Sequence, residues 1–241
     1  MDAYLQTIQE VPLFDGIKTG ELPTILQCLQ AKTVQYEKDD YILLAGSLPK
    51  YVGVILCGRI QVVKDDITGN RTLITSLGPG GIFGETLCCA GVQESPVSVV
   101  AESACTVLLL AFSKILHICS NACVFHGRLI QNMLLLLAKK NLYLQSSLRI
   151  LSGSSIRERV QRYLEPFANQ YGRHFRVPLN REQMAEYLCV DRSALSHALR
   201  RMKEDGLIDY RKNEFWITGK LKHKAAKASN AFAALFTLTP T

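Results

Sequence analysis

The sequence predicts an α+β protein with a β-rich first half, a long central helix and a small helical domain near its C-terminus. Three observations support this prediction: short β-rich runs between Thr33 and Phe112, a nearly uninterrupted helical pattern from Asn121 to Leu148, and two short helical segments after Leu179. With 241 residues, of which 48% are hydrophobic and 20% charged, the chain suits two globular domains of ordinary size.

The first half begins with short helices and continues as strands. Residues Leu5–Leu29 are predicted as short helices because Pro12, Gly16 and Pro23 interrupt them. Seven β-rich runs are predicted as strands: Val34–Tyr36, Tyr41–Leu44, Val52–Leu56, Arg59–Val63, Thr72–Leu77, Val97–Val100 and Thr106–Ala111. Many short strands with glycine turns between them favour a β-sandwich or barrel.

The central helix is predicted from about Asn121 to Leu148, where no proline occurs and Gly127 is the only interruption. Its apolar residues cover more than one face, and such a helix must be buried on more than one side. One side can pack on the β-rich half, and the other suits the same helix in a second copy. Burial inside one larger monomeric core is the alternative.

A pair of helices is predicted in the last third of the chain. Asn180, with Gln183 three residues later, forms a variant of the capping box before the helix Arg181–Leu188. Asp191 suits the N-cap of the next helix, Arg192–Glu204. Two short helices joined by a three-residue turn are the helix-turn-helix plan.

The second helix of this pair has one apolar and one polar face. Leu195, Leu199 and Met202 form the predicted buried stripe. The opposite face holds only hydrogen-bond donors and no acid: Arg192, Ser193, Ser196, His197 and Arg200. These side chains can read base edges and contact phosphates in a major groove. An ordinary amphipathic helix pair with a solvated face is the alternative.

The flanking segments complete a winged domain. Ser152–Ser155 is predicted as a hinge that ends in an N-cap, before the amphipathic helix Ile156–Tyr171. Gly206 stops the second helix of the pair, and the strands Leu207–Tyr210 and Glu214–Ile217 follow around a basic turn. A winged helix-turn-helix is therefore expected at the C-terminal end.

Charge is divided unevenly along the chain. Residues 1–148 hold 11 Lys and Arg against 12 Asp and Glu, whereas residues 149–241 hold 17 against 9. A polyanion suits the basic part, although a basic surface that only aids solubility is the alternative. The apolar stretches Thr106–Phe112 and Met133–Ala138 are far shorter than a membrane span, and Met1–Tyr4 has no basic signal region. We therefore expect a cytoplasmic protein without a membrane partner, whose 8 cysteines form no disulfide framework.

The sequence resembles the CRP/FNR regulators in two places. One is the barrel stretch Pro79–Glu85, and the other comprises Leu179–Leu188, Val190–Ser196 and Gly206–Ile208. The resemblance implies a β-roll sensor domain (a double-stranded β-helix or jelly roll), a long dimerisation helix and a winged helix that docks on palindromic double-stranded DNA. It also implies DNA bending and contact with RNA polymerase. Together with the helix pattern, it leads us to expect a homodimer, and we do not expect an enzyme.

The domains expected from these observations are the sensor domain over residues 1–120, the dimerisation helix and hinge over 121–151, the DNA-binding domain over 152–220 and a tail of unknown role over 221–241. An enzyme that uses a Cys/His site is the competing interpretation. The sequence, however, has no nucleophile elbow, P-loop or paired-carboxylate signature. A third interpretation is a nucleotide-binding module of a larger assembly, but it does not explain the excess of Lys and Arg in residues 149–241.

By position, Arg192, Ser193, His197 and Arg200 align with the DNA-reading residues of the family. The remaining DNA-binding candidates are Ser196, Asn180, Arg181 and Lys212. Two departures stand out. His197 replaces a frequent arginine, which weakens a bidentate guanine contact. Cys189 replaces a turn glycine, at a cost of about 1 kcal/mol if the backbone there is left-handed.

The expected effector site departs from the cyclic-nucleotide pattern of the family. Gly84 and Glu85 match the ribose-binding pair, but Ser95 stands where the phosphate-binding arginine is expected. Because a buried phosphate without a cation is costly, cyclic AMP is not expected, and the effector is unknown. The candidate effector-binding residues are Phe83, Gly84, Glu85, Ser95 and, from the long helix, Arg128. Glu85 suits an alternative role, in which it caps its own loop.

A Cys/His group gives an alternative sensor. Cys119, Cys123 and His126 lie at i, i+4 and i+7 on one helical face, with His117 close behind. Thiolate and imidazole together suit zinc or an iron–sulfur cluster, which would make the protein a metal- or redox-sensing regulator. The same face can simply pack against the barrel.

Overall fold

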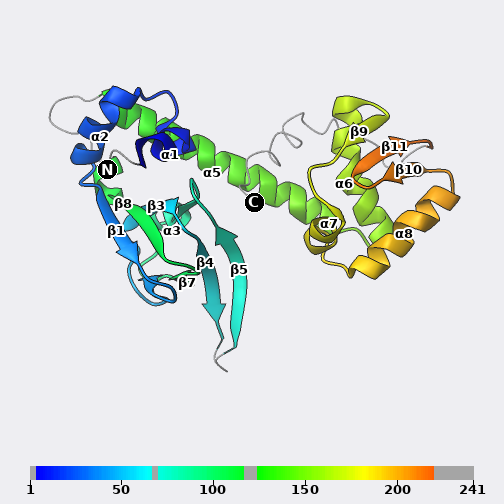
Figure 1. The fold of residues 1–241 in the computed structure, drawn as a ribbon, viewed down its shortest axis with the longest axis horizontal. Coiled ribbons are helices and arrows are strands. Elements are labelled where there is room, and N and C mark those ends of the chain that lie inside the picture. The colour runs from blue at the N-terminus through cyan, green and yellow to red at the C-terminus, as the bar shows by residue number, and fades with distance from the viewer. Residues whose placement is uncertain (1–3, 67–69, 117–123, 220–241) are drawn as a thin grey trace. The chain divides into compact units, whose positions relative to one another are not determined.

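The computed structural model describes residues 4–66, 70–116 and 124–219, and the chain divides into two compact units, Met1–Ala138 and Lys139–Thr239. The boundary between the units lies within helix α5, Val124–Leu151 (Figure 1). Among the described residues, no helix has both the length and the apolar character that a membrane crossing requires.

The first unit is built on two antiparallel sheets of four strands. The strands are β1 Lys32–Tyr36, β2 Tyr41–Leu43, β3 Tyr51–Cys57, β4 Ile60–Asp65, β5 Arg71–Leu77, β6 Ile82–Phe83, β7 Ser98–Ala101 and β8 Cys105–Ala111. One sheet has the order β1-β8-β3-β6 and the other β2-β7-β4-β5. All seven predicted strands are present, with ends within two residues of their expected bounds, and only the two-residue β6 was not predicted.

The two sheets pack face to face, which makes this part a β-sandwich. Ile55 and Val107 from one sheet share a buried cluster with Ile60 and Val99 from the other. Strand β3 is buried along five consecutive residues because its second face is covered as well, by helices. A strand covered on both faces has a continuous apolar sequence rather than an alternating one.

Short helices cover the outer face of the β3 sheet. They are α1 Leu5–Glu10, the 3₁₀ turns Pro12–Phe14 and Thr19–Glu21, and α2 Leu22–Cys28, followed later by α3 Glu85–Cys89 and α4 Phe112–Leu116. Figure 1 shows α1 and α2 beside the first part of α5. The Asn132 amide fixes this packing, since Nδ2 donates to the carbonyls of Leu13 (3.0 Å) and Asp15 (2.9 Å).

Helix α5 has the two-sided apolar character that the sequence predicts. Leu129 and Met133 are buried in the core of the first unit. Five other leucines are more than 40% exposed: Leu134, Leu135, Leu142, Leu144 and Leu148.

The described part of the second unit combines the end of α5 and three further helices with a small antiparallel sheet. The elements are α6 Ile156–Tyr171, β9 His174–Arg176, α7 Arg181–Tyr187, α8 Arg192–Glu204, β10 Ile208–Arg211 and β11 Glu214–Ile217. The sheet order is β10-β11-β9, and the His174 and Trp216 rings stack at 4.7 Å between centroids. All three predicted helices and the hairpin are present, whereas β9 was not predicted.

Helix capping in the second unit follows the sequence with one exception. The Ser155 hydroxyl accepts from the Glu158 amide, and the Asn180/Gln183 capping box forms with both of its reciprocal hydrogen bonds. Asp191 occupies the N-cap of α8 as predicted, but its carboxylate makes no capping hydrogen bond. The helix begins there because Asp191 has extended backbone geometry.

Candidate nucleic-acid interface and sensor site

Helix α8 presents a polar face to solvent and an apolar face to the core. Leu195, Leu199 and Met202 have no exposed surface and pack in the core of the second unit. The predicted DNA-reading side chains are all exposed: Arg192, Ser193, Ser196, His197 and Arg200. The amphipathic prediction for this helix is therefore confirmed, and the donor face is open to a ligand.

Two side chains of this face have partners within the helix. The Ser196 hydroxyl donates to the carbonyl of Arg192 at 2.9 Å, and Arg200 Nε lies 2.9 Å from a Glu204 carboxylate oxygen. The Arg200–Glu204 pair is largely exposed, and exposed pairs of this kind are worth only a few tenths of a kcal/mol. A phosphate or a guanine can therefore displace Glu204 at small cost.

The turn between α7 and α8 has the strained backbone that the sequence suggests. Cys189 has φ of 52°, in the left-handed region that favours glycine. The turn is held by Arg159 of α6, whose guanidinium donates to the carbonyls of Gly153 (3.1 Å) and Leu188 (3.1 Å). Sequence reasoning missed Arg159, because no local pattern links residues 29 positions apart.

The three remaining DNA-binding candidates lie around the start of α7 and the hairpin turn. Asn180 is exposed, but its side-chain oxygen caps α7 by accepting from the Glu182 and Gln183 amides. Lys212 is exposed at the turn between β10 and β11. Arg181 is half-buried, and it donates to the Lys212 carbonyl at 2.9 Å.

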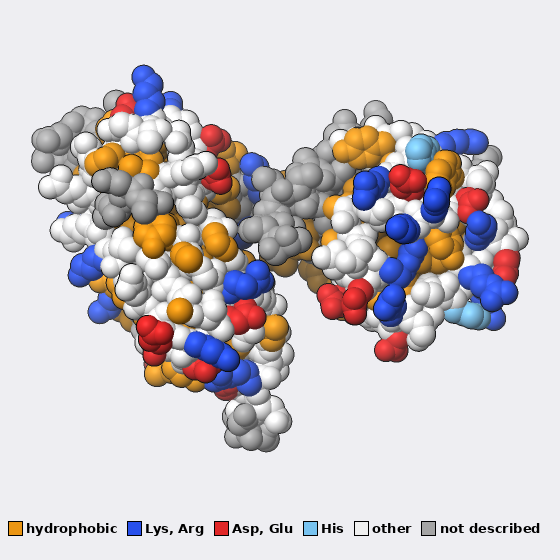
Figure 2. All heavy atoms as spheres, in the orientation of Figure 1, with side chains coloured by type: hydrophobic (Ala, Val, Ile, Leu, Met, Phe, Trp, Pro, Cys, Tyr) orange, Lys and Arg blue, Asp and Glu red, His pale blue; other side chains and the backbone are white. Residues whose placement is uncertain are grey.

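Part of the positive charge of the second unit is already paired with acidic side chains. Lys and Arg side chains are spread over the face of this unit that Figure 2 shows, in blue, with acidic side chains between them. Ion pairs within the described part of this unit include Arg149–Glu165, Arg157–Asp205, Arg162–Glu158, Arg200–Glu204 and Lys203–Asp209. The hydrogen bond to Lys203 holds the pKa of Asp209 below its usual value, so this pair is charged at neutral pH. A count of basic residues therefore overstates the charge available to a polyanion.

The first unit contains the candidate effector residues. Gly84 has φ of 79°, and a Cβ there would lie 2.8 Å from the Tyr51 carbonyl oxygen, so only glycine fits. Glu85 begins α3 with 3% of its surface exposed, and one carboxylate oxygen accepts from the Thr86 hydroxyl at 3.1 Å. The Phe83 ring is buried over Gly53, where it fills the space that a side chain would need.

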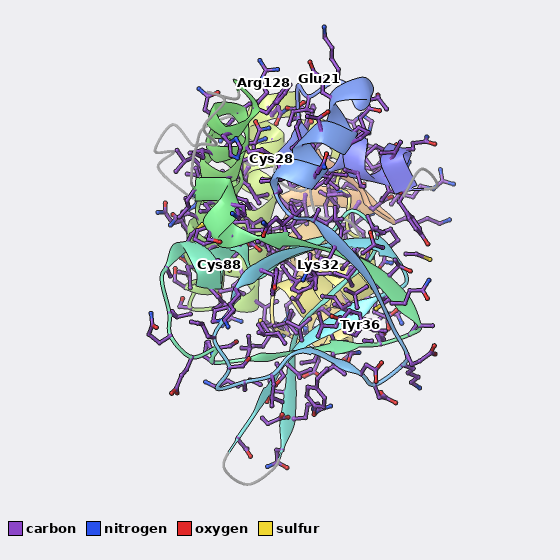
Figure 3. All side chains as sticks on the ribbon, turned by 90° about the vertical axis from the view of Figure 1, so that its left-hand side faces the viewer. Glu21, Cys28, Lys32, Tyr36, Cys88 and Arg128 are labelled. Atoms are coloured by element: carbon purple, nitrogen blue, oxygen red, sulfur yellow. The ribbon has the colours of Figure 1, made fainter. Side chains whose placement is uncertain are left out.

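The side chains of Ser95 and Arg128 form hydrogen bonds within the first unit. Ser95 is 3% exposed, and its hydroxyl donates to the Val97 carbonyl at 2.6 Å. The Arg128 guanidinium donates to the Gly16 carbonyl. Figure 3 shows Arg128 beside the N-terminal helices and away from Cys88 on α3. The structure thus does not bring Arg128 to the helix that begins with Glu85.

The Cys/His group lies largely outside the described residues, since His117, Cys119 and Cys123 fall in the segment 117–123. His126 is 2% exposed, and its Nε2 lies 3.1 Å from the Lys114 carbonyl and 3.8 Å from Cys28 Sγ. Sequence spacing gave no signal for Cys28, which is 98 residues away. Within the part of the chain that the structure describes, no group of three His, Cys, Asp or Glu could hold a metal. A metal site at Cys119, Cys123 and His126 stays a prediction.

Cys88 behaves as a small apolar side chain. It is 6% exposed in the core under β3, and its thiol donates to the Pro49 (3.5 Å) and Tyr51 (3.6 Å) carbonyls. Burial, with smaller contributions from Cys89 and Glu85, raises the pKa of this thiol to about 11. A thiol with so little thiolate at neutral pH is a poor nucleophile and metal ligand.

Two protein families match the chain. Residues 33–122 match the cyclic nucleotide-binding domain, and residues 158–219 match the Crp-like helix-turn-helix domain. The first match covers most of the β-sandwich, and the second covers α6 to β11.

One similar protein is named cyclic AMP receptor protein and comes from Thermus thermophilus. It is 24% identical over 198 residues, which are 82% of this chain and 88% of that protein. A human cyclic nucleotide-gated channel, beta-3, is 30% identical over 112 residues, which is 46% of this chain and 13% of the channel. The crystal structure of the Thermus thermophilus catabolite activator protein has the same fold, with a TM-score of 0.51 and 22% identity, over 86% of this chain and 93% of that one.

Proposed function

We propose that this chain, a CRP/FNR-type protein, is a sequence-specific DNA-binding transcription regulator that acts as a homodimer. The premise is its cyclic nucleotide-binding domain, followed by a Crp-like helix-turn-helix domain. The observation that carries this proposal is the face of α8, where all five exposed side chains are of types that can donate hydrogen bonds. The opposite face of α8 is buried in the core, so the donor face is the one that a partner can contact.

In the proposed complex, α8 lies in the major groove. Arg192 reads guanine through a bidentate contact, and Ser193 and His197 contact neighbouring base edges. Asn180, Ser196, Arg200 and Lys212 are the proposed contacts that set position on the backbone. Two such helices related by a two-fold axis would read half-sites about 34 Å apart on a palindromic operator.

The exposed leucines of α5 support the homodimer. Leu135 and Leu142 are seven residues apart and therefore share one side of the helix, and both are more than 40% exposed. Large exposed apolar surfaces mark interaction sites, and a second copy of α5 offers the same side in return. Burial of this side between two copies removes it from water.

We propose that an effector in the first unit controls DNA binding, and that it is not cyclic AMP. A relative bears the name cyclic AMP receptor protein. In this chain Ser95 is buried and bonded to the Val97 carbonyl, and no Lys or Arg occurs between Arg71 and Lys114. A cyclic phosphate placed near Glu85 would be buried without a cation. Contact with RNA polymerase, which the family resemblance implies, completes the proposal.

Selection of bound sequences from a random DNA pool tests this function. We expect an enriched palindrome that Arg192→Ala no longer selects, while Lys64→Ala, which removes an exposed charge from the first unit, selects it normally. Affinity for the enriched site, followed by fluorescence anisotropy, should fall steeply with salt. Failure to enrich any sequence, together with binding that does not depend on salt, would exclude the proposal.

A further inference from the structure

We infer that Arg181 is a positioning residue for the wing, the hairpin formed by β10, β11 and their turn, rather than a residue that contacts DNA itself. This inference rests on the proposed function only for its consequence in DNA binding. Its structural part concerns contacts within the second unit and can be tested without DNA.

The Arg181 guanidinium lies in a cage made by the wing. Its central carbon is 5.0 Å from the Tyr210 ring centroid and 5.7 Å from that of Phe215, one ring from each strand of the hairpin. A guanidinium over aromatic rings is attracted by their negative faces. Arg181 thus contacts both wing strands from the first residue of α7.

Hydrogen bonds complete the cage. Nη2 of Arg181 donates to the Lys212 carbonyl at 2.9 Å, and Nη1 lies 3.8 Å from the Met184 sulfur. Burial lowers the pKa of Arg181, with Tyr210 opposing this effect, but the guanidinium of an arginine remains charged at neutral pH. Two nitrogens of this guanidinium are therefore directed at groups inside the domain, the Lys212 carbonyl and the Met184 sulfur.

The contacted carbonyl belongs to a strained residue. Lys212 has φ of 55°, which non-glycine residues adopt only when their surroundings hold them. Two restraints are present at this turn: the bond from Arg181, and the exchange between Asn213 and Val177, in which Asn213 Nδ2 donates to the Val177 carbonyl and the Val177 amide donates to the Asn213 carbonyl. Only the first restraint links the turn to the helix-turn-helix.

Geometry also explains why lysine cannot replace arginine here. The planar guanidinium places one nitrogen on the Lys212 carbonyl while its face covers an aromatic ring, whereas an ammonium is a compact point charge. Arg181→Lys therefore keeps the positive charge but loses the planar arrangement of N–H donors. A residue that only contacts phosphate would tolerate this exchange well.

Hydrogen–deuterium exchange without DNA tests the structural part. In Arg181→Lys and Arg181→Met, the segment Arg211–Glu214 should exchange about tenfold faster than in the wild type, while α8 keeps its protection. Tyr210→Phe, which retains the ring, is the matched control and should exchange like the wild type. Circular dichroism verifies that each variant is folded. Unchanged exchange of the wing in both Arg181 variants would overturn the inference.

A double-mutant cycle with Lys212→Ala tests the consequence for DNA. If Arg181 acts through the wing, Arg181→Lys should weaken binding as Lys212→Ala does, and the double variant should be no weaker than Lys212→Ala, within about twofold. If Arg181→Lys binds like the wild type, or the two losses add fully, Arg181 contacts phosphate and the inference fails while the proposed function stands. If the wild type itself binds no DNA, the proposed function fails, and the exchange experiment still decides the role of Arg181.

Discussion

Asn132 is expected to hold the N-terminal helices against α5, and Asn132→Leu should destabilise the first unit by about 3 kcal/mol. The side chain is 9% exposed, and its amide supplies both the Leu13 and the Asp15 carbonyl. Leucine has a similar size but donates no hydrogen bond. The Leu13 bond is buried and its loss costs about 2 kcal/mol, while the part-buried Asp15 bond costs about 1 kcal/mol.

Urea unfolding followed by far-ultraviolet circular dichroism measures this change. Asn141→Leu is the matched control, because Asn141 lies on the same helix but is exposed. An exposed site of this kind should change stability by less than about 0.5 kcal/mol. Hydrogen exchange should in addition show faster opening of Leu5–Phe14 in Asn132→Leu only.

The reasoning would be refuted by an Asn132→Leu protein whose unfolding midpoint and slope equal those of Asn141→Leu. That result would mean that water or a small backbone shift satisfies both carbonyls. A loss confined to the slope would instead indicate a change in the surface exposed on unfolding, and not a loss of these two bonds.

Four further predictions concern other parts of the molecule. Cys189→Gly should relieve the strain of the left-handed backbone and raise the free energy of unfolding by about 0.5–1 kcal/mol. Cys189→Ala, which keeps Cβ, should not raise it, and urea titrations of the three proteins measure the difference. Lysine at both Leu135 and Leu142 should convert the proposed dimer to a monomer, and a mass unchanged in sedimentation equilibrium would rule out that face. Because burial raises the pKa of Cys88 to about 11, the rate of its alkylation by iodoacetamide should increase roughly tenfold per pH unit between about pH 8 and pH 10. The alkylation rate of an exposed thiol should level off at a lower pH, and peptide mass spectrometry measures both rates. His197→Arg should favour guanine at its base position by about 1–3 kcal/mol in competition binding, and an unaltered base preference would remove His197 from the reading set.

The fold was predictable because its signals are local and repeated. Glycine turns separate the strands of the sandwich, and the capping box at Asn180 marks the start of α7 from the sequence itself. The exposure of the α8 donor face followed from the spacing of Leu195, Leu199 and Met202. Periodicity determines which side of a helix is buried, so these predictions needed no tertiary information.

The candidate sites were harder to predict because their contacts join distant segments. From the sequence, Arg181 is a DNA-binding candidate, but in the structure it is half-buried against the wing, through contacts with residues about 30 positions later. Likewise, nothing near Cys28 indicates that it lies against His126. Local pattern shows the type of side chain available, whereas tertiary packing decides which of its atoms are free to bind.

The stacked pair of Trp216 and His174 gives the protein a natural optical probe. The chain contains one tryptophan, and it stands on β11 with its indole plane 6° from that of the imidazole on β9. Selectively excited emission therefore originates from the wing sheet and from nowhere else in the polypeptide. Spectral shifts on titration with an oligonucleotide would register events at that sheet directly, without an attached dye.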